Sequence, residues 1–244
     1  MADKKILGMI TARGGSKRVP RKNVKEFCGK PLLAWTIETG NAAGVFDRFI
    51  LSTEDEEIMA IGKEYGIEVP FKRPQEHATD AAGSYGVIKH AVEWLKEQEQ
   101  YEPYWIILLE PSSPGRQPFH VQEVAAIIKE KGDNLDSIIG ISPAPGQFSP
   151  HRAFELNDEK CIERVGDHIT LREVLKTVKK DLPPTYFINS AIYAFNVKTL
   201  FDGVESLWGN RTYGYVMDID YALDIDTPHE WITAEAHIKH LLDK

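Results

Sequence analysis

Short apolar runs alternate with segments of helical periodicity over the first part of the chain. Runs typical of buried strands occupy residues 6–11, 49–53, 67–71, 105–110 and 138–142. Apolar side chains recur at helical spacing in residues 31–42, 55–65, 84–97 and about 119–131. This alternation predicts right-handed crossovers and therefore an α/β fold of three layers, with helices on both faces of a mostly parallel sheet. Ligands of such sheets bind beyond the carboxyl ends of the strands, so we expect function in the loops that follow them.

The alternation stops between residues 143 and 185, a stretch rich in Pro, Gly and charge. A loop of this length without structure of its own would be unusual, so we interpret it as a subdomain inserted into a single domain of residues 1–244. Hairpin-like pieces are expected near residues 152–156 and 161–165. Regular elements are expected again at residues 190–196, 197–205, 212–216 and 228–242.

Composition narrows the class of protein further. Of the 244 residues, 42% are hydrophobic and 27% are charged, as in ordinary globular proteins with a full core. The longest apolar runs have strand length, far below the roughly 20 residues of a membrane span, and the N-terminus lacks a signal-peptide pattern. Cys28 and Cys161 are too far apart for a thiolate zinc site. We therefore expect a cytoplasmic protein without a membrane partner.

The distribution of charge is more informative than the net charge of −8. Residues 12–30 contain seven basic side chains and one acid, a net of +6, so the rest of the chain carries −14. The overall acidity argues against nucleic acid as a partner. A compact cationic segment in an acidic protein indicates a small polyanionic ligand, although a solvated basic loop would have the same composition.

The basic segment contains the sequence ITARGGSKRVPRKN, residues 10–23, directly after the first predicted strand. Adjacent Gly14 and Gly15 would allow backbone N–H groups to approach phosphate oxygens, and the flanking Arg and Lys would neutralise their charge. The spacing is neither that of a Walker A loop nor that of a dinucleotide fingerprint. The motif predicts a phosphate-binding loop of another kind, while the glycines alone would indicate only a tight turn.

A second motif, Asp224-Ile225-Asp226, precedes the last predicted helix. Residues two apart in extended backbone point to the same side, so both carboxylates could bind one Mg²⁺. Alternatively, Asp226 or Thr227 before Pro228 could cap the helix. A nearby triphosphate site would favour the metal, because phosphoryl transfer usually requires a divalent ion.

Taken together, the motifs resemble those of the cytidylyltransferases that activate sialic and other nonulosonic acids, the CMP-acylneuraminate synthetase group. The phosphate-loop sequence ARGGSKRVPRKN resembles the signature of that family. Further blocks follow in family order, namely RP with ATDAAGS at residues 73–84, LLEPSSPGR at 108–116, NSAIY at 189–193 and LDID at 223–226. The resemblance extends over essentially the whole chain and implies a Rossmann-like nucleotidyltransferase fold with CTP as co-substrate and Mg²⁺ as cofactor.

The resemblance also implies roles for individual residues. The CTP site would contain Arg13, Gly14, Gly15, Ser16, Lys17, Lys22, Asn23, Arg73, Ala82 and Ser84. Arg13, Lys22, Asp224 and Asp226 would be catalytic, with the two aspartates as metal ligands. The acidic nine-carbon sugar would meet Glu110, Ser112, Ser113, Arg116, Arg152, Lys179, Asn189 and Tyr193. The inserted segment would be a dimerisation subdomain, making the protein a homodimer.

Three positions depart from the family pattern. Glu110 replaces a Gln, Gly115 replaces a Leu and Ser190 replaces a Gly. A carboxylate at Glu110 would repel an acidic sugar unless it faced a hydroxyl or an amine, so we expect a modified nonulosonic acid as acceptor. Two alternatives stay open. One is a 3-deoxy-octulosonate cytidylyltransferase, whose shorter basic loop matches less well, and the other is a non-catalytic nucleotide-binding regulator on the same fold.

Overall fold

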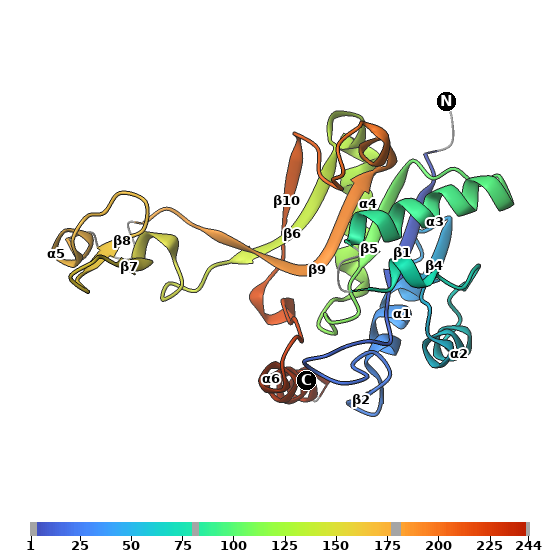
Figure 1. Cartoon of the computed structure of the whole chain (residues 1–244), viewed down its shortest axis with the longest axis horizontal. Coiled ribbons are helices and arrows are strands. Elements are labelled where there is room, and N and C mark those ends of the chain that lie inside the picture. Colours follow the sequence, from blue (N-terminus) through green and yellow to red (C-terminus); the bar gives the residue numbers. More distant parts are fainter. Residues whose placement is uncertain (1–3, 80–82, 177–181, 243–244) are drawn as a thin grey trace.

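The computed structural model describes residues 4–79, 83–176 and 182–242, and in these a six-stranded sheet forms the centre of the molecule (Figure 1). The strands lie in the order β10-β6-β9-β5-β1-β4. Their bounds are β1 Ile6–Thr11, β4 Arg48–Ser52, β5 Trp105–Leu109, β6 Ser137–Pro143, β9 Tyr186–Asn196 and β10 Thr212–Val216. A small hairpin pairs β2 (Glu26–Phe27) with β3 (Lys30–Pro31).

The predicted, mostly parallel sheet is confirmed, with one reversed strand. β1 runs parallel to β4 and β5, and β10 runs parallel to β6, whereas β9 is antiparallel to both of its neighbours. β9 returns from β6 through the long segment between them without a crossover helix packed on the sheet, and a strand that returns in this way pairs antiparallel. The pairing of β6 with β9 shifts register between Ile139 and Ile141, and Ser190 of β9 has a φ of +58°.

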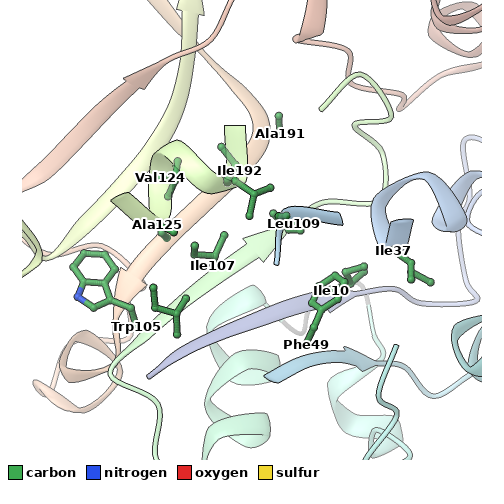
Figure 2. Packing of buried hydrophobic residues seen from close by; sticks show 14 of the residues in the cluster. Ile10, Ile37, Phe49, Trp105, Ile107, Leu109, Val124, Ala125, Ala191 and Ile192 are labelled. Atoms are coloured by element: carbon green, nitrogen blue, oxygen red, sulfur yellow. The ribbon is translucent and has the colours of Figure 1, made fainter. Parts of the chain in front are cut away.

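The predicted helices cover both faces of the sheet. Their bounds are α1 Leu32–Ala43, α2 Glu56–Glu64, α3 Ser84–Glu99 and α4 Pro118–Lys131. Alternate residues of β5 separate the two layers, because Ile107 and Leu109 pack with α1 and α4 while Ile106 and Leu108 pack with α3. Figure 2 shows the first of these clusters, in which Ile37 of α1 and Val124 of α4 lie over the sheet.

The C-terminal helix α6 (Pro228–Leu242) packs on the basic loop region, outside the two layers over the sheet. Its Trp231 and Ile238 form a third cluster with Val19, Phe27 and Ile225. The rings of Phe27 and Trp231 meet edge to face with centroids 5.2 Å apart. Burial of large apolar side chains contributes roughly 1.5–3 kcal/mol each, so this cluster fixes the Asp224–Asp226 segment against the loop.

Between β6 and β9 the chain forms an arm that extends away from the body of the molecule (Figure 1). The arm contains the hairpin of β7 (Phe154–Leu156) and β8 (Ile162–Arg164), followed by the short helix α5 (Leu171–Val174). This is the segment that the sequence indicated as an insertion. In the described residues, no helix is both long and apolar enough to cross a membrane.

Two predicted elements differ from the structure. Instead of a strand at residues 67–71, the chain forms isolated parallel bridges to the β4 region at Glu68 and, one residue beyond the predicted bounds, at Lys72. Residues 197–205 form only a short 3₁₀ helix, Val197–Phe201. The chain turns at Gly203, whose φ of +90° lies in the region that ends regular helices.

Candidate active site

Two adjoining pockets lie beyond the carboxyl ends of β1 and β5, where the sequence pattern predicted a site. The loop pocket is lined by Thr11, Arg13, Ser16, Lys17, Arg18, Val19, Lys22, Asn23, Glu110, Pro111, Ser112 and Asp226. The α3 pocket is lined by Thr11, Arg13, Arg73, His77, Thr79, Ser84, Val87 and Glu110. Thr11, Arg13 and Glu110 line both, so the two pockets form one continuous site.

Most of the predicted nucleotide-binding residues therefore meet at this site. The loop pocket brings the basic loop together with the turn after β5 and with Asp226, which is more than 200 residues away from the loop in sequence. The α3 pocket adds Arg73 and Ser84. Ala82 and Lys179, two further predicted site residues, lie outside the described residues.

Gly14 has a different role from the one expected. The Gly14 N–H donates to Glu54 Oε1 at 2.8 Å, so this amide is not available to a phosphate. A Cβ at Gly14 would lie 2.3 Å from the Asp55 carboxylate, whereas one at Gly15 would have nothing within 4 Å. Gly14 thus allows close packing against an acidic pair after β4. The positive character of the loop pocket comes from its Arg and Lys side chains.

Asn23 holds the loop in shape from inside. Its side chain is buried, and its Nδ2 donates to the carbonyl of Arg13 at 3.0 Å. The Asn23 carbonyl accepts from the Leu33 N–H, also at 3.0 Å, which ties the loop to α1. The Asn23 Oδ1 is buried without a hydrogen-bond partner among the described residues. Asn23 therefore supports the loop while it lines the pocket.

Asp226 is the point at which the basic loop meets the C-terminal segment. Lys22 Nζ donates to Asp226 Oδ1 at 3.1 Å and to the Ile225 carbonyl at 2.6 Å. Arg18 Nη2 donates to Asp226 Oδ2 at 2.7 Å. Burial pushes the pKa of Asp226 upward, but hydrogen bonds and charge from Lys22 and Arg18 outweigh it and leave the pKa below its ordinary value.

Asp224 is partly buried, stands two residues before Asp226 with fully buried Ile225 between them, and interacts with the charge of Asp226. Burial raises the pKa of Asp224, and the charge of Asp226 raises it further, although hydrogen bonds from Ser112 and Ser190 act in the opposite direction. Two neighbouring carboxylates, one of them with a raised pKa, form a place where a cation would be stabilised.

The donor set fits Mg²⁺. Proteins usually hold this ion through one or two carboxylates, and substrate phosphates and water complete the coordination. Asp224 and Asp226 provide such a pair. No group of three or more His, Cys, Asp or Glu side chains within residues 4–79, 83–176 and 182–242 could hold a metal by itself. A divalent ion at this site would therefore need further ligands from water or from a substrate.

Arg73 forms the buried wall of the α3 pocket. Its side chain is 4% exposed, and its Nη2 donates to the carbonyls of Ala12 and Ser52 at 2.5 and 2.9 Å. Glu54 lies 3.2 Å from the same nitrogen, and Arg73 Nε is buried with no hydrogen-bond partner within the described part of the chain. Burial lowers the pKa of Arg73. The guanidinium is thus fixed by the ends of β1 and β4 and retains an unused donor.

Glu110 occupies the boundary between the two pockets. Burial raises the pKa of its carboxyl to about 7, against the lowering effect of the Arg116 charge. Asp224 and Asp226 contribute further negative potential. A neutral Gln at this position would not have the free-energy cost of burying an ionised carboxyl. The Glu110 carboxylate is therefore electrostatically unfavourable here unless a ligand group pairs with it.

Arg116 lies beneath the site instead of in the sugar-binding position that the resemblance implied. It lines neither pocket, and its side chain is 1% exposed. Its Nη1 donates to the carbonyls of Ala191 and Glu110, and its Nη2 donates to Thr36 Oγ1 at 2.8 Å. Burial lowers its pKa to about 9. The guanidinium joins α1, β9 and the turn after β5.

Asn189 is likewise turned inward. Its side chain is buried, with Nδ2 donating to Ser142 Oγ at 3.0 Å and Oδ1 accepting from the Ala191 N–H at 3.1 Å. A Cβ at Gly140 would lie 2.6 Å from this Oδ1, so Asn189 fills the space at the irregularity between β6 and β9. Asn189 thus shapes β9 and does not line a pocket.

Three other residues that were predicted to contact the sugar line neither pocket. Ser113 is buried below the turn, while Tyr193 packs on Trp208 and shares a hydrogen bond with Ser190. Since Ser190 also bonds Asp224, Tyr193 is connected to the carboxylate pair through one residue. Arg152 belongs to the arm, in a short 3₁₀ helix just before β7, and lines neither pocket.

Three residues that line or support the pockets were given no site role from the sequence, and one of them, His77, was interpreted there as an ordinary surface or helix-face histidine. Arg18 was counted only as part of the basic segment, and Glu54 does not belong to any of the motifs identified in the sequence. His77 lines the α3 pocket and packs against His90, with ring centroids 5.1 Å apart. Its position between Arg73 and Ser84 in the sequence was the available signal.

The sheet, the basic loop and the carboxylate pair define an α/β protein of the nucleotidyltransferase type. The profile of the cytidylyltransferase family matches residues 7–235, and the chain belongs to this family. It is similar to N-acylneuraminate cytidylyltransferase of Streptococcus agalactiae serotype III (strain NEM316), with 32% identity over 238 residues, 96% of this chain and 53% of that protein. The chain thus spans about half the length of that relative.

Two further similarities cover nearly full lengths. Pseudaminic acid cytidylyltransferase of Campylobacter jejuni subsp. jejuni serotype O:2 is 30% identical over 223 residues, 91% of each chain. The solved structure of a CMP:2-keto-3-deoxy-manno-octonic acid synthetase complexed with CTP superimposes with a TM-score of 0.70 over 97% of this chain and 99% of that one. At 14% identity, this second likeness shows the fold alone.

Proposed function

We propose that the protein transfers CMP from CTP to the anomeric hydroxyl of a nonulosonic acid and releases pyrophosphate. The observation that carries this proposal is the single site in which the basic loop, Asp226 and the Arg73 wall meet, with Asp224 interacting with the charge of Asp226. Family membership and the activities for which the relatives are named support the same reaction class.

The two pockets suggest how the nucleotide is held. Arg13, Lys17 and Lys22 of the loop pocket are proposed to bind the triphosphate, since clustered cations bind phosphate through charge-assisted hydrogen bonds. Arg73 is proposed to donate to the cytosine edge, for which its unpaired Nε supports the assignment. Ser84, the first residue of α3, would meet the ribose or base at the positive end of that helix.

The chemistry requires no covalent nucleophile from the protein. The anomeric hydroxyl of the sugar releases its proton to solvent as its oxygen forms a bond with the α-phosphorus, and the bond from that phosphorus to the bridging oxygen breaks as pyrophosphate leaves. Mg²⁺ held by Asp224 and Asp226 would screen phosphate charge and lower the pKa of the attacking hydroxyl. Lys22 orients Asp226 from one side, while Ser112 and Ser190 orient Asp224 from the other.

Glu110 is proposed to select the acceptor. A carboxylate near an acidic sugar favours an acceptor that presents an amine, an amide or a hydroxyl to it, as modified nonulosonic acids of the pseudaminate or legionaminate type do. Arg152 of the arm is proposed to meet the sugar carboxylate, and so is Lys179, which lies outside the described residues. Replacing Glu110 by Gln should therefore change acceptor preference more than CTP affinity, and an unchanged acceptor profile would contradict this role.

The arm is proposed to form a homodimer. Several of its apolar side chains are more than half exposed, namely Phe148, Leu156, Val165 and Leu175, and so is Ile188 at the start of β9. Exposed apolar side chains in this number are typical of a surface covered in an assembly. Light scattering after gel filtration should give twice the chain mass for the wild type and a monomer for the double variant Leu156→Asp, Leu175→Asp. A monomeric wild type would refute the proposal.

The decisive experiment measures pyrophosphate release from CTP and Mg²⁺ with a panel of acceptors. The panel contains N-acetylneuraminate, pseudaminate, legionaminate and 3-deoxy-octulosonate, with Asp226→Asn as the matched inactive variant. Turnover with an eight-carbon acid alone would favour the octulosonate alternative. CTP binding without pyrophosphate release from any acid would favour the regulator.

A further inference from the structure

The two oxygens of the Asp226 carboxylate are bound by different cations of the basic loop. Lys22 contacts Oδ1 at 3.1 Å, and Arg18 contacts Oδ2 at 2.7 Å. Asp226 is also one of the two carboxylates that fit Mg²⁺. Arg18 therefore holds an oxygen that a divalent ion would need.

The two cations differ in how firmly they are anchored. The Lys22 side chain is 16% exposed and also donates to the Ile225 carbonyl at 2.6 Å. The Arg18 side chain is 65% exposed, and Asp226 is the partner to which its guanidinium donates among residues whose positions are described. An exposed ion pair contributes at most about 1 kcal/mol, so Arg18 can be displaced at little cost while Lys22 stays in place.

Displacement would leave Arg18 close to another anion. Arg18 lines the same pocket as Arg13 and Lys17, the residues proposed to bind the triphosphate. A guanidinium released from Asp226 would thus find phosphate oxygens in the pocket that it already lines, and Arg binds phosphate through paired, charge-assisted hydrogen bonds.

We propose that Arg18 is an exchangeable counter-ion, which competes with a divalent ion for Asp226 and moves to the triphosphate when the ion binds. This inference rests on the proposed metal role of Asp226. Arg18 would then couple the binding of the ion to the binding of the nucleotide. The ion displaces Arg18 from Asp226 and the triphosphate holds Arg18 away from it, so each ligand favours the binding of the other.

The first test measures Mn²⁺ binding to the nucleotide-free, EDTA-treated full chain, using the electron paramagnetic resonance signal of free Mn²⁺. Arg18→Gln should bind Mn²⁺ about two- to fivefold more tightly than the wild type, the effect expected for loss of an exposed competing pair. Lys25→Gln is the matched control, since Lys25 belongs to the same loop but lies over the Trp231 ring, 4.4 Å from its centroid. It should leave Mn²⁺ affinity unchanged.

The second test measures CTP binding by calorimetry. With excess Mg²⁺, Arg18→Gln should weaken binding about tenfold, the value of a lost charge-assisted hydrogen bond, whereas with EDTA the loss should be smaller. Equal losses under both conditions would overturn the exchange. Thermal melting of Arg18→Gln at the wild-type temperature checks that its fold is intact.

Asp226→Asn separates failure of this inference from failure of the proposed function. If Asp226→Asn loses Mn²⁺ while Arg18→Gln binds it as the wild type does, the competition is refuted and the metal role stands. If Asp226→Asn binds Mn²⁺ as tightly as the wild type, both the metal role and the competition are refuted.

Discussion

Thr227 and Glu230 cap the C-terminal helix reciprocally. The Thr227 hydroxyl accepts from the Glu230 N–H at 3.3 Å, and Glu230 Oε2 accepts from the N–H groups of Thr227 and Asp226 at 2.7 and 2.8 Å. The sequence left open whether Asp226 caps the helix or binds a metal. Because Thr227 and Glu230 satisfy the helix terminus, the Asp226 carboxylate is turned to the loop cations instead.

Removal of this cap should reduce stability without removing the chemistry. Thr227→Ala should lower the free energy of unfolding by about 1 kcal/mol, measured by urea denaturation, because an N–H at the helix start loses its partner. Thr227→Ser keeps the hydroxyl and serves as the control. Pyrophosphate release should persist in both variants. A Thr227→Ala variant as stable as the wild type would show that the cap contributes nothing.

Gly115, where the family has Leu, is explained by a close backbone approach. A Cβ at this position would lie 2.7 Å from the Tyr221 carbonyl oxygen. Gly115→Ala should therefore lower the free energy of unfolding by about 1–3 kcal/mol in urea denaturation, the usual cost of overpacking. Gly15→Ala, whose Cβ would meet nothing within 4 Å, should stay within about 0.5 kcal/mol of the wild type. Equal stability of the two variants would contradict this explanation.

The fold could be predicted largely from local pattern, and its departures have long-range causes. The strand at residues 6–11 and the helix at 228–242 have the predicted bounds, because their apolar spacing already matches the environment in which they pack. The antiparallel direction of β9 could not be predicted, because the apolar pattern of a strand is the same for a parallel and an antiparallel strand. The direction of β9 results from the return of the chain through the arm.

The site was predictable where its residues are adjacent in sequence and not where burial decides their role. The basic loop was found because its cations are clustered. Arg116 stands in a motif beside the turn, but only tertiary structure reveals that the carbonyls of Ala191 and Glu110 occupy its guanidinium. Residue type alone does not distinguish a cation that meets substrate from one that joins three elements.

Arg116 should consequently affect stability more than sugar binding. Arg116→Met leaves buried carbonyls without donors and should lower the free energy of unfolding by at least about 3 kcal/mol. Arg116→Lys restores the charge without the planar fork and should recover part of the loss. In the Lys variant, we expect the KM for the sugar to stay near the wild-type value. A large rise in that KM with unchanged stability would indicate that Arg116 binds the sugar after all.

Glu110 should make the stability of the protein depend on pH. Its pKa rises from about 4.5 to about 7 on folding, so between these values the folded chain binds a proton that the unfolded chain has released. The stability of the wild type should therefore fall as pH rises through this window. Glu110→Gln carries no charge and should be about 1–3 kcal/mol more stable than the wild type at pH 8, but similar to it at pH 5. Urea denaturation of both proteins at the two pH values measures the difference, and a difference independent of pH would show that Glu110 ionises normally.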